Sequence, residues 1–171
     1  MKLKICLLFF VLCLCSCKKT FKDDELSLQR EFYDGNAIRL DGYYYYHGKN
    51  STSVFFLYRN GVVLKGMSFE GVNLDVIEKT MIEYYDIIRK RKYHWGVYII
   101  RENILEVESW GSVGWTRTLP IFKSFYNIVN DTTLNLIKEV NLSDGRETEY
   151  NDIYHFRQFY PKPDSTNNFI K

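Results

Sequence analysis

The stretch VFFLYRNGVVLKG, residues 54–66, sets two apolar runs on either side of Asn60-Gly61. Asn and Gly tolerate the positive φ angles that a type I′ turn requires, so the stretch predicts a tight β-hairpin. This is the clearest local signal in the sequence. Antiparallel β-structure is therefore the starting point for the fold.

Strand-like alternation continues on both sides of that hairpin. Upstream, a first strand is expected over residues 37–46, AIRLDGYYYY, with a bulge or bend at Asp41-Gly42. Downstream, alternation predicts two more hairpins and a last strand, at residues 95–100 with 104–110, 125–130 with 133–140, and 150–159. The turns between the paired strands are short, so neighbouring strands are expected to run antiparallel.

Residues 73–92, NLDVIEKTMIEYYDIIRKRK, have a helical period instead. One apolar stripe at 3-4-3-4 spacing is formed by Leu74, Ile77, Met81, Tyr84 and Ile88. Asn73 is expected to cap the start, and the basic residues 89–92 complement the helix dipole at the end. We expect this helix to pack on the sheet, with adsorption of its basic cluster to a membrane surface as the alternative.

Together these elements predict a mainly β (α+β) fold with one domain over residues 31–171. About eight strands form an antiparallel meander that curls into a partial or closed barrel, with one amphipathic helix inserted mid-chain. Aromatic residues make up 17% of the chain, with 14 Tyr and 12 Phe. Such residues favour half-buried pleated surfaces, so most of them are expected to fill the core.

The first residues form a segment of a different kind. Lys2 and Lys4 precede an apolar run from Ile5 to Leu14, and all four cysteines of the chain lie within residues 6–17. Ten apolar residues in a helix reach about 15 Å, whereas a hydrocarbon core of about 30 Å needs roughly twenty. A basic start and a short apolar centre are typical of a secretory signal.

The residues after the apolar run, Leu14-Cys15-Ser16-Cys17, resemble the lipobox of bacterial lipoproteins. This resemblance implies a lipoprotein signal peptide over residues 1–16, with Cys17 as the lipidation site that carries diacylglycerol and a further acyl chain such as palmitate. Each buried methylene contributes about 0.8 kcal/mol, and stable anchoring takes two or more chains. The alternative is an ordinary signal peptide cut elsewhere, with Cys17 left as an unmodified thiol.

Residues 17–30 are then the acylated cysteine and a flexible tether, whose charged sequence has a reach of about 20 Å. Within it, Lys22–Glu25 (KDDE) resembles the acidic surface-export signal of Bacteroidetes-type lipoproteins, with a solvated charge run as the alternative. We expect a lipid-anchored protein of the cell envelope, at the outer membrane. Whether it lies on the periplasmic or the surface face stays open.

Charge argues against a nucleic-acid partner. Removal of residues 1–16 leaves 21 basic and 21 acidic residues, without the positive surface that polynucleotide binding requires. His47, His94 and His155 are scattered and have no partner at metal-ligand spacing. The expected partners are therefore the lipid bilayer, through Cys17, and an unidentified small molecule or protein, with no metal or other cofactor.

One pair of carboxylates was considered for catalysis. Glu106 and Glu108 lie two residues apart, so both share a strand face with Trp110. Leu105 and Val107 occupy the opposite face, which we expect to be the core. The two glutamates are therefore expected in solvent, and no catalytic residue is assigned.

Taken together, the lipobox and the stretches DGYYYY, YRNGVVL, WGVYIIRENILEVESW and KPDSTN look like the small uncharacterised lipoproteins of Bacteroidetes, a resemblance that implies no known function. A looser likeness is to lipocalin-like β-barrels, from which the mid-chain helix departs. We expect a non-catalytic lipoprotein that binds a small apolar or glycan ligand in a barrel cavity of at least about 300 Å³. Candidate contacts are Trp95, Tyr98, Trp110 and Trp115.

Two alternatives remain open at this stage. The first is a structural or interaction lipoprotein that acts as an accessory subunit at the outer membrane and exposes an apolar patch of several hundred Å². The second is a weak hydrolase, which needs a carboxylate of perturbed acidity near His94 or Glu108.

Overall fold

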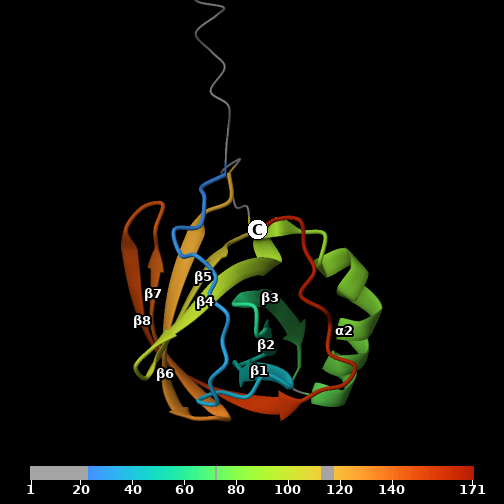
Figure 1. Cartoon of the computed structure of the whole chain (residues 1–171). Coiled ribbons are helices and arrows are strands. Elements are labelled where there is room, and N and C mark those ends of the chain that lie inside the picture. Colours follow the sequence, from blue (N-terminus) through green and yellow to red (C-terminus); the bar gives the residue numbers. More distant parts are fainter. Residues whose placement is uncertain (1–22, 72, 113–117) are drawn as a thin grey trace, which may run out of the picture.

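The computed structural model describes residues 23–71, 73–112 and 118–171. In this part of the chain eight strands form a closed antiparallel barrel in the order of the sequence, and β8 pairs back onto β1. The expected mainly β meander is confirmed, and the barrel closes. A single longer helix, α2, lies along one side of it (Figure 1).

The strand and helix bounds agree with most of the predicted elements. The strands are β1 Gly42–His47, β2 Ser51–Leu57, β3 Val62–Glu70, β4 Trp95–Arg101, β5 Ile104–Trp110, β6 Ile121–Asn130, β7 Thr133–Asn141 and β8 Arg146–Gln158. The helices are α2 Leu74–Ile88 and the 3-10 helix η1 Lys92–His94.

The β2–β3 hairpin forms where it was predicted, but its turn type was predicted wrongly. Gly61 has a φ of 76°, whereas Asn60 is not among the described residues with positive φ. The Gly61 N–H donates to the Tyr58 carbonyl at 3.0 Å, and the Tyr58 N–H donates to the Val62 carbonyl at 3.0 Å. This pattern is a three-residue loop that ends in a left-handed glycine. Such a loop matches the twist of the two strands without a type I′ turn.

The first strand begins at Gly42 and not at Ala37. The residues before it leave the sheet and cross one end of the barrel, where the Arg39 N–H donates to the Asp131 carbonyl at 2.9 Å. A Cβ at position 42 would lie 2.0 Å from the Arg157 carbonyl oxygen. A glycine there lets β1 approach β8 closely enough to close the barrel.

Helix α2 starts as predicted and ends earlier than predicted. The Asn73 side chain accepts hydrogen bonds from the N–H groups of Asp75 and Val76, so it caps the first turn. At the other end, the Trp95 indole N–H donates to the Arg89 carbonyl at 2.9 Å. That bond ties the end of the helix to the start of β4, so residues 89–92 do not continue the helix.

The apolar stripe of α2 differs from the prediction at one position. Ile77 and Met81 are buried, but Tyr84 is 51% exposed. Tyr85 takes its place against the barrel, and its hydroxyl donates to the Asp164 carbonyl in the C-terminal segment. The buried face of α2 therefore includes Tyr85 in place of Tyr84, because the helix packs against the C-terminal segment as well as against the barrel.

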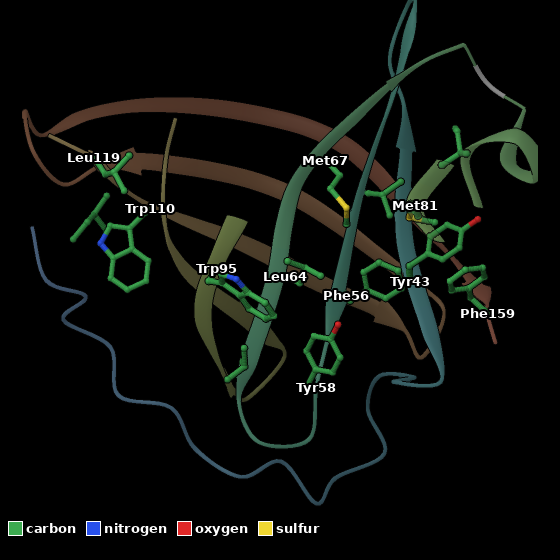
Figure 2. Close-up of a cluster of buried hydrophobic side chains, with 14 residues drawn as sticks. Tyr43, Phe56, Tyr58, Leu64, Met67, Met81, Trp95, Trp110, Leu119 and Phe159 are labelled. Carbon is green, nitrogen blue, oxygen red and sulfur yellow. The ribbon is translucent and has the colours of Figure 1, made fainter. Parts of the chain in front are cut away.

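The side chains of the barrel form two apolar layers. The barrel interior is filled by residues from all eight strands, among them Tyr44, Phe55, Val63, Tyr98, Leu105, Tyr126, Leu134 and Tyr154. The outer core lies between the barrel wall and the segments that cover it, and contains Tyr43, Phe56, Leu64, Met81, Trp95, Trp110 and Phe159 (Figure 2). Because β2 and β4 are covered on both faces, the stretches VFFL and WGVYII carry apolar residues on both faces.

The two ends of the barrel differ. We call the end with the β2–β3, β4–β5 and β6–β7 turns the hairpin end, and the opposite end the η1 end. Residues 33–40 cross the hairpin end, where Ile38 is 4% exposed and contacts the barrel interior. The hairpin end is thus closed by the chain itself.

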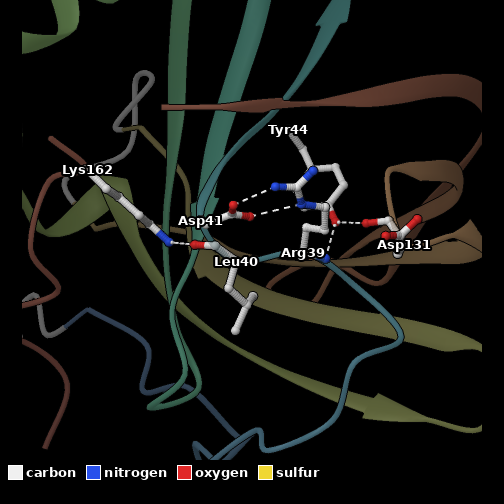
Figure 3. Close-up of polar contacts among 6 residues, drawn as sticks. All are labelled: Arg39, Leu40, Asp41, Tyr44, Asp131 and Lys162. Carbon is white, nitrogen blue, oxygen red and sulfur yellow. Dashed lines mark hydrogen bonds and ion pairs between the residues drawn. The ribbon is translucent and has the colours of Figure 1, made fainter. Parts of the chain in front are cut away.

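A lysine from the C-terminal segment joins this closure. The Lys162 ammonium donates to the Leu40 carbonyl and, at 2.6 Å, to the Leu57 carbonyl, and lies 4.3 Å from the centre of the Tyr58 ring. Next to it, Arg39 pairs with Asp41, and the Tyr44 hydroxyl donates to Asp131 (Figure 3). The polar groups drawn there are paired with one another, so they fasten the segments that cover this end.

Candidate functional site

The barrel interior changes from apolar to polar towards the η1 end. Register pairs Val107 with Ser124 and Ser124 with Glu139, so these three residues point to one side of neighbouring strands. Ser109 follows Val107 on the same face of β5. The core-facing side of β5 and β6 thus carries hydroxyl groups where it reaches the η1 end.

Lys65 enters the same region from β3. The pairing of β2 with β3 shifts register between Val54 and Phe56, so β3 has one extra residue next to Lys65. Such a bulge re-aims a side chain. Glu139 is the only charged group that acts on the Lys65 ammonium among the described residues, and burial lowers the pKa of Lys65.

These residues line a pocket of about 160 Å³ at the η1 end. Its polar lining is Lys65, Ser109, Ser112 and Glu139, and aromatic walls are supplied by Tyr93, Trp110 and Phe122. Gly111 lies at its edge, where a Cβ would be 2.4 Å from the Phe122 ring. We call this space the mouth pocket.

One buried polar group in the mouth pocket lacks a partner. The Ser109 side chain is fully buried, and its hydroxyl makes no hydrogen bond in the described part of the chain. The Lys65 side chain is partly buried, and the charged group that acts on its ammonium is Glu139. A buried hydroxyl left without a partner costs about 1–3 kcal/mol.

Glu139 is only partly engaged. The Ser124 hydroxyl donates to its Oε2 atom at 2.9 Å, and this is its one hydrogen bond to the described residues. The pocket therefore presents a cation, a hydroxyl and a carboxylate oxygen to whatever enters it.

The sequence-predicted ligand contacts do not converge on this pocket. Trp95 is fully buried in the outer core below the end of α2. Tyr98 points into the barrel interior, and its hydroxyl donates to the Tyr58 carbonyl near the hairpin end. Trp110 borders the mouth pocket, whereas Trp115 lies outside the described residues.

The expected solvent exposure of Glu106 and Glu108 is wrong. Glu108 is fully buried and accepts hydrogen bonds from the Ser27 N–H and hydroxyl and from the Leu28 N–H. Glu106 is 12% exposed and pairs with Lys123 at 2.7 Å. The reason is that residues 23–30 cover this face of β5, which alternation alone assigns to solvent.

The same contacts bear on the expected tether. Residues 17–22 lie outside the described part of the chain, but residues 23–30 lie against the barrel. Asp23 pairs with Lys92 at 3.0 Å and accepts a hydrogen bond from the Leu119 N–H. The Trp110 indole N–H donates to the Asp24 carbonyl at 2.9 Å. This stretch is bound to the domain along eight residues.

The histidines occupy separate places. The ring of His47 is hydrogen-bonded to Thr52, and His94 contacts the Lys65 carbonyl at 3.0 Å. Burial lowers the pKa of His94, while His155 is exposed. Throughout residues 23–171, masked stretches aside, no three His, Cys, Asp or Glu side chains come together as a possible metal site.

The larger hollows lie outside the barrel interior. A groove of about 430 Å³ runs between α2 and β3, and a hollow of about 620 Å³ lies over the hairpin end beside Lys162. A third, of about 690 Å³, separates residues 25–30 from the chain end at 169–171. The mouth pocket is smaller than the 300 Å³ cavity expected from the sequence.

The sequence reasoning missed Lys65, Ser109 and Glu139. Ser109 continues the core-facing positions Leu105 and Val107. Lys65 directly follows the apolar run VVL. Both were therefore visible in the sequence as polar residues at core positions. Glu139 was not, because it faces inward only after the register shift between Leu136 and Lys138.

Comparison with known proteins adds no information on this pocket. The chain matches no protein-family model, no curated protein and no solved structure. Within its described residues, no helix has the length and apolarity needed to cross a membrane.

Proposed function

We propose that the protein is a lipid-anchored envelope lipoprotein that binds a small polar ligand of glycan type in the mouth pocket, without catalysing a reaction on it. The observation that carries the binding proposal is the fully buried Ser109 hydroxyl, which has no hydrogen-bond partner among the described residues and shares a pocket with the Lys65 side chain. Buried polar groups are normally hydrogen-bonded, so an unpartnered hydroxyl beside a lysine favours a polar ligand that completes it.

The chemistry of the lining favours a polyol. A sugar hydroxyl both donates and accepts, and here Lys65 donates, Glu139 accepts and Ser109 does either. The Phe122 and Tyr93 side chains add apolar surface, which suits the C–H face of a sugar ring. The pocket of about 160 Å³ limits the bound part of the ligand to a small group.

The apolar ligand considered from the sequence fits this lining less well. An apolar molecule would leave the hydroxyl without a partner and would remove the ammonium further from water. The barrel interior below the pocket is filled with side chains. A polar ligand at the mouth is therefore favoured over an apolar ligand inside the barrel.

A non-catalytic role is favoured by the carboxylates. Glycoside hydrolysis usually takes two carboxyl groups on opposite sides of the bond that breaks. Glu139 is the only carboxylate among the described residues that line the mouth pocket, and Glu108 is enclosed by three donors from residues 27 and 28.

The anchor rests on the lipobox resemblance of residues 14–17. Mass spectrometry of the protein extracted from envelopes tests it: the mass of residues 17–171 plus diacylglyceryl and acyl groups is expected. Cys17→Ala is expected to lose the acyl groups and to leave the membrane fraction. An unmodified Cys17, or an Ala variant that sediments equally well, would rule out the anchor.

Binding is tested by saturation-transfer NMR of the full-length protein with a panel of free monosaccharides. At least one sugar is expected to bind, and Lys65→Met and Ser109→Ala are each expected to weaken it about tenfold or more. The matched control is Lys123→Met, which removes an ammonium from the outer face at Glu106. Binding by no sugar, or equal binding by all variants, would contradict the proposal.

A further inference from the structure

Asp23, the first described residue, lies near the end of α2. Asp23 is held there by Lys92, which follows the helix, and by the Leu119 N–H. Figure 1 shows residues 23–30 running along β4 and β5 from the η1 end. Whatever lies upstream of Asp23 therefore meets the domain at the η1 end.

The length of chain between that point and the proposed anchor is short. Five residues separate Cys17 from Asp23, and a fully extended chain of six steps spans about 20 Å. The headgroup region is itself several ångströms thick on each side of the hydrocarbon. Asp23 thus stays within about 20 Å of the acylated cysteine, so the η1 end is the end nearest to the bilayer.

The surface beside this attachment is apolar and unpartnered. Tyr84 is 51% and Ile87 is 49% exposed on α2. Both border the groove of about 430 Å³, whose other wall is formed by Met67 and Phe69 of β3. These side chains lie in the second half of the helix, towards the end that contacts Asp23.

Positive charge flanks the apolar residues. Lys90 and Arg91 follow the helix and are exposed. Arg91 also borders the groove, where its guanidinium lies 5.9 Å from the Tyr93 ring centre. Of the acids in this half of the helix, Asp86 pairs with Arg89 at 3.1 Å, and Glu83 is exposed. The sequence between Cys17 and Asp23 adds Lys18, Lys19 and Lys22.

We infer that the second half of α2, with Tyr84, Ile87, Lys90 and Arg91, docks on the anionic phospholipid surface that holds the anchor. The inference rests on the proposed lipidation of Cys17. Tyr84 and Ile87 enter the boundary between headgroups and acyl chains, as in interfacial amphipathic helices, and the basic residues contact anionic headgroups. The hairpin end then points away from the bilayer.

Single cysteines test this orientation. If Cys17 is acylated, the mature chain has no other thiol, so Ile87→Cys can be labelled with an environment-sensitive fluorophore. Val129→Cys, 60% exposed at the hairpin end, is the matched control. The full-length acylated protein is reconstituted in vesicles of phosphatidylcholine alone or with about one-third phosphatidylglycerol, and quenching by brominated lipid is measured.

The label at Ile87 is expected to be quenched about twofold more than the label at Val129, and more strongly with phosphatidylglycerol present. Lys90→Glu with Arg91→Glu is expected to remove the difference between the two vesicles. Arg101→Glu, at the hairpin end, is expected to leave it unchanged. High salt is expected to act like the charge reversal, because it screens exposed charges.

Three outcomes would overturn the inference. Equal quenching at both positions in floating vesicles would overturn the orientation and leave the anchor intact. A label at Ile87 that is shielded from water but not quenched by lipid would indicate a protein partner instead. Protein that floats with neither vesicle would overturn both the proposed anchor and the docking surface.

Discussion

The two ends of the barrel each hold a partly buried lysine, and the surroundings of the two lysines differ. At the hairpin end, the Lys162 ammonium donates to the Leu40 and Leu57 carbonyls and contacts the Tyr58 ring. At the η1 end, the Lys65 ammonium has no hydrogen-bond partner in the described chain. Burial alone does not distinguish a structural lysine from a binding lysine, but the number of its partners does.

The largest effect is expected from Lys162→Met. The substitution keeps the side-chain length but leaves the Leu40 and Leu57 carbonyls without their donor, so the free energy of unfolding should fall by about 2–4 kcal/mol. Urea denaturation followed by circular dichroism measures this. Lys171→Met, an exposed lysine in the same C-terminal segment, should change it by less than about 0.5 kcal/mol. A loss no greater than that of the control would mean that Lys162 does not fasten this end.

A pH titration examines the same lysine. Burial lowers the pKa of Lys162 to about 8 from 10.5, against the opposing effect of Asp41. Between these values the unfolded chain binds more protons, so the free energy of unfolding should rise by about 1–2 kcal/mol from pH 8 to 9.5. The Lys65→Met variant is the proper background, because burial lowers the pKa of Lys65 as well. Adding Lys162→Met should flatten the curve; a rise that persists would assign it to other groups.

The same substitution at the other end should have the opposite sign. Lys65→Met replaces a partly buried ammonium that has no hydrogen bond to the described residues by an apolar side chain of similar length, so the protein should gain about 1 kcal/mol of stability while it loses ligand binding. Thermal unfolding of the two methionine variants, measured side by side, is the sharpest form of the comparison. A destabilised Lys65→Met would show that the ammonium has a partner in the folded protein.

The smallest effect is expected from the hydroxyl groups of the mouth pocket. Ser109→Ala removes a buried hydroxyl without a partner and should raise the free energy of unfolding by about 0.5–1 kcal/mol. Ser124→Ala removes the hydrogen bond to Glu139 and should lower it by a similar amount. If both alanine variants lose stability equally, the Ser109 hydroxyl is hydrogen-bonded in solution.

The contrast between the two ends also explains what the sequence could predict. Short loops and the Asn60-Gly61 turn predict a meander, and the meander closes because Gly42 allows β1 to reach β8. The mouth pocket depends on the register shift in β7, which turns Glu139 inward. A bulge of this kind leaves no periodic trace, so local patterns could not place this side chain.

The burial of Glu108 could not be predicted from local sequence patterns either, but for a different reason. Its partners are Ser27 and Leu28, about eighty residues away in the sequence. Alternation tells which strand face points outward, but it does not tell which part of the outside another segment covers. The same holds for Lys162, whose acceptors belong to residues 40 and 57.

The pairing of β1 with β8 has a consequence for how the chain is made. Gly42 meets Gln158, so the ring of strands cannot be completed until nearly the whole polypeptide has emerged. Until then the growing meander keeps two unpaired edges, at β1 and at its newest strand. Only after the last strand arrives does the sheet lose its two free edges and become a shell that resists pairing with other chains.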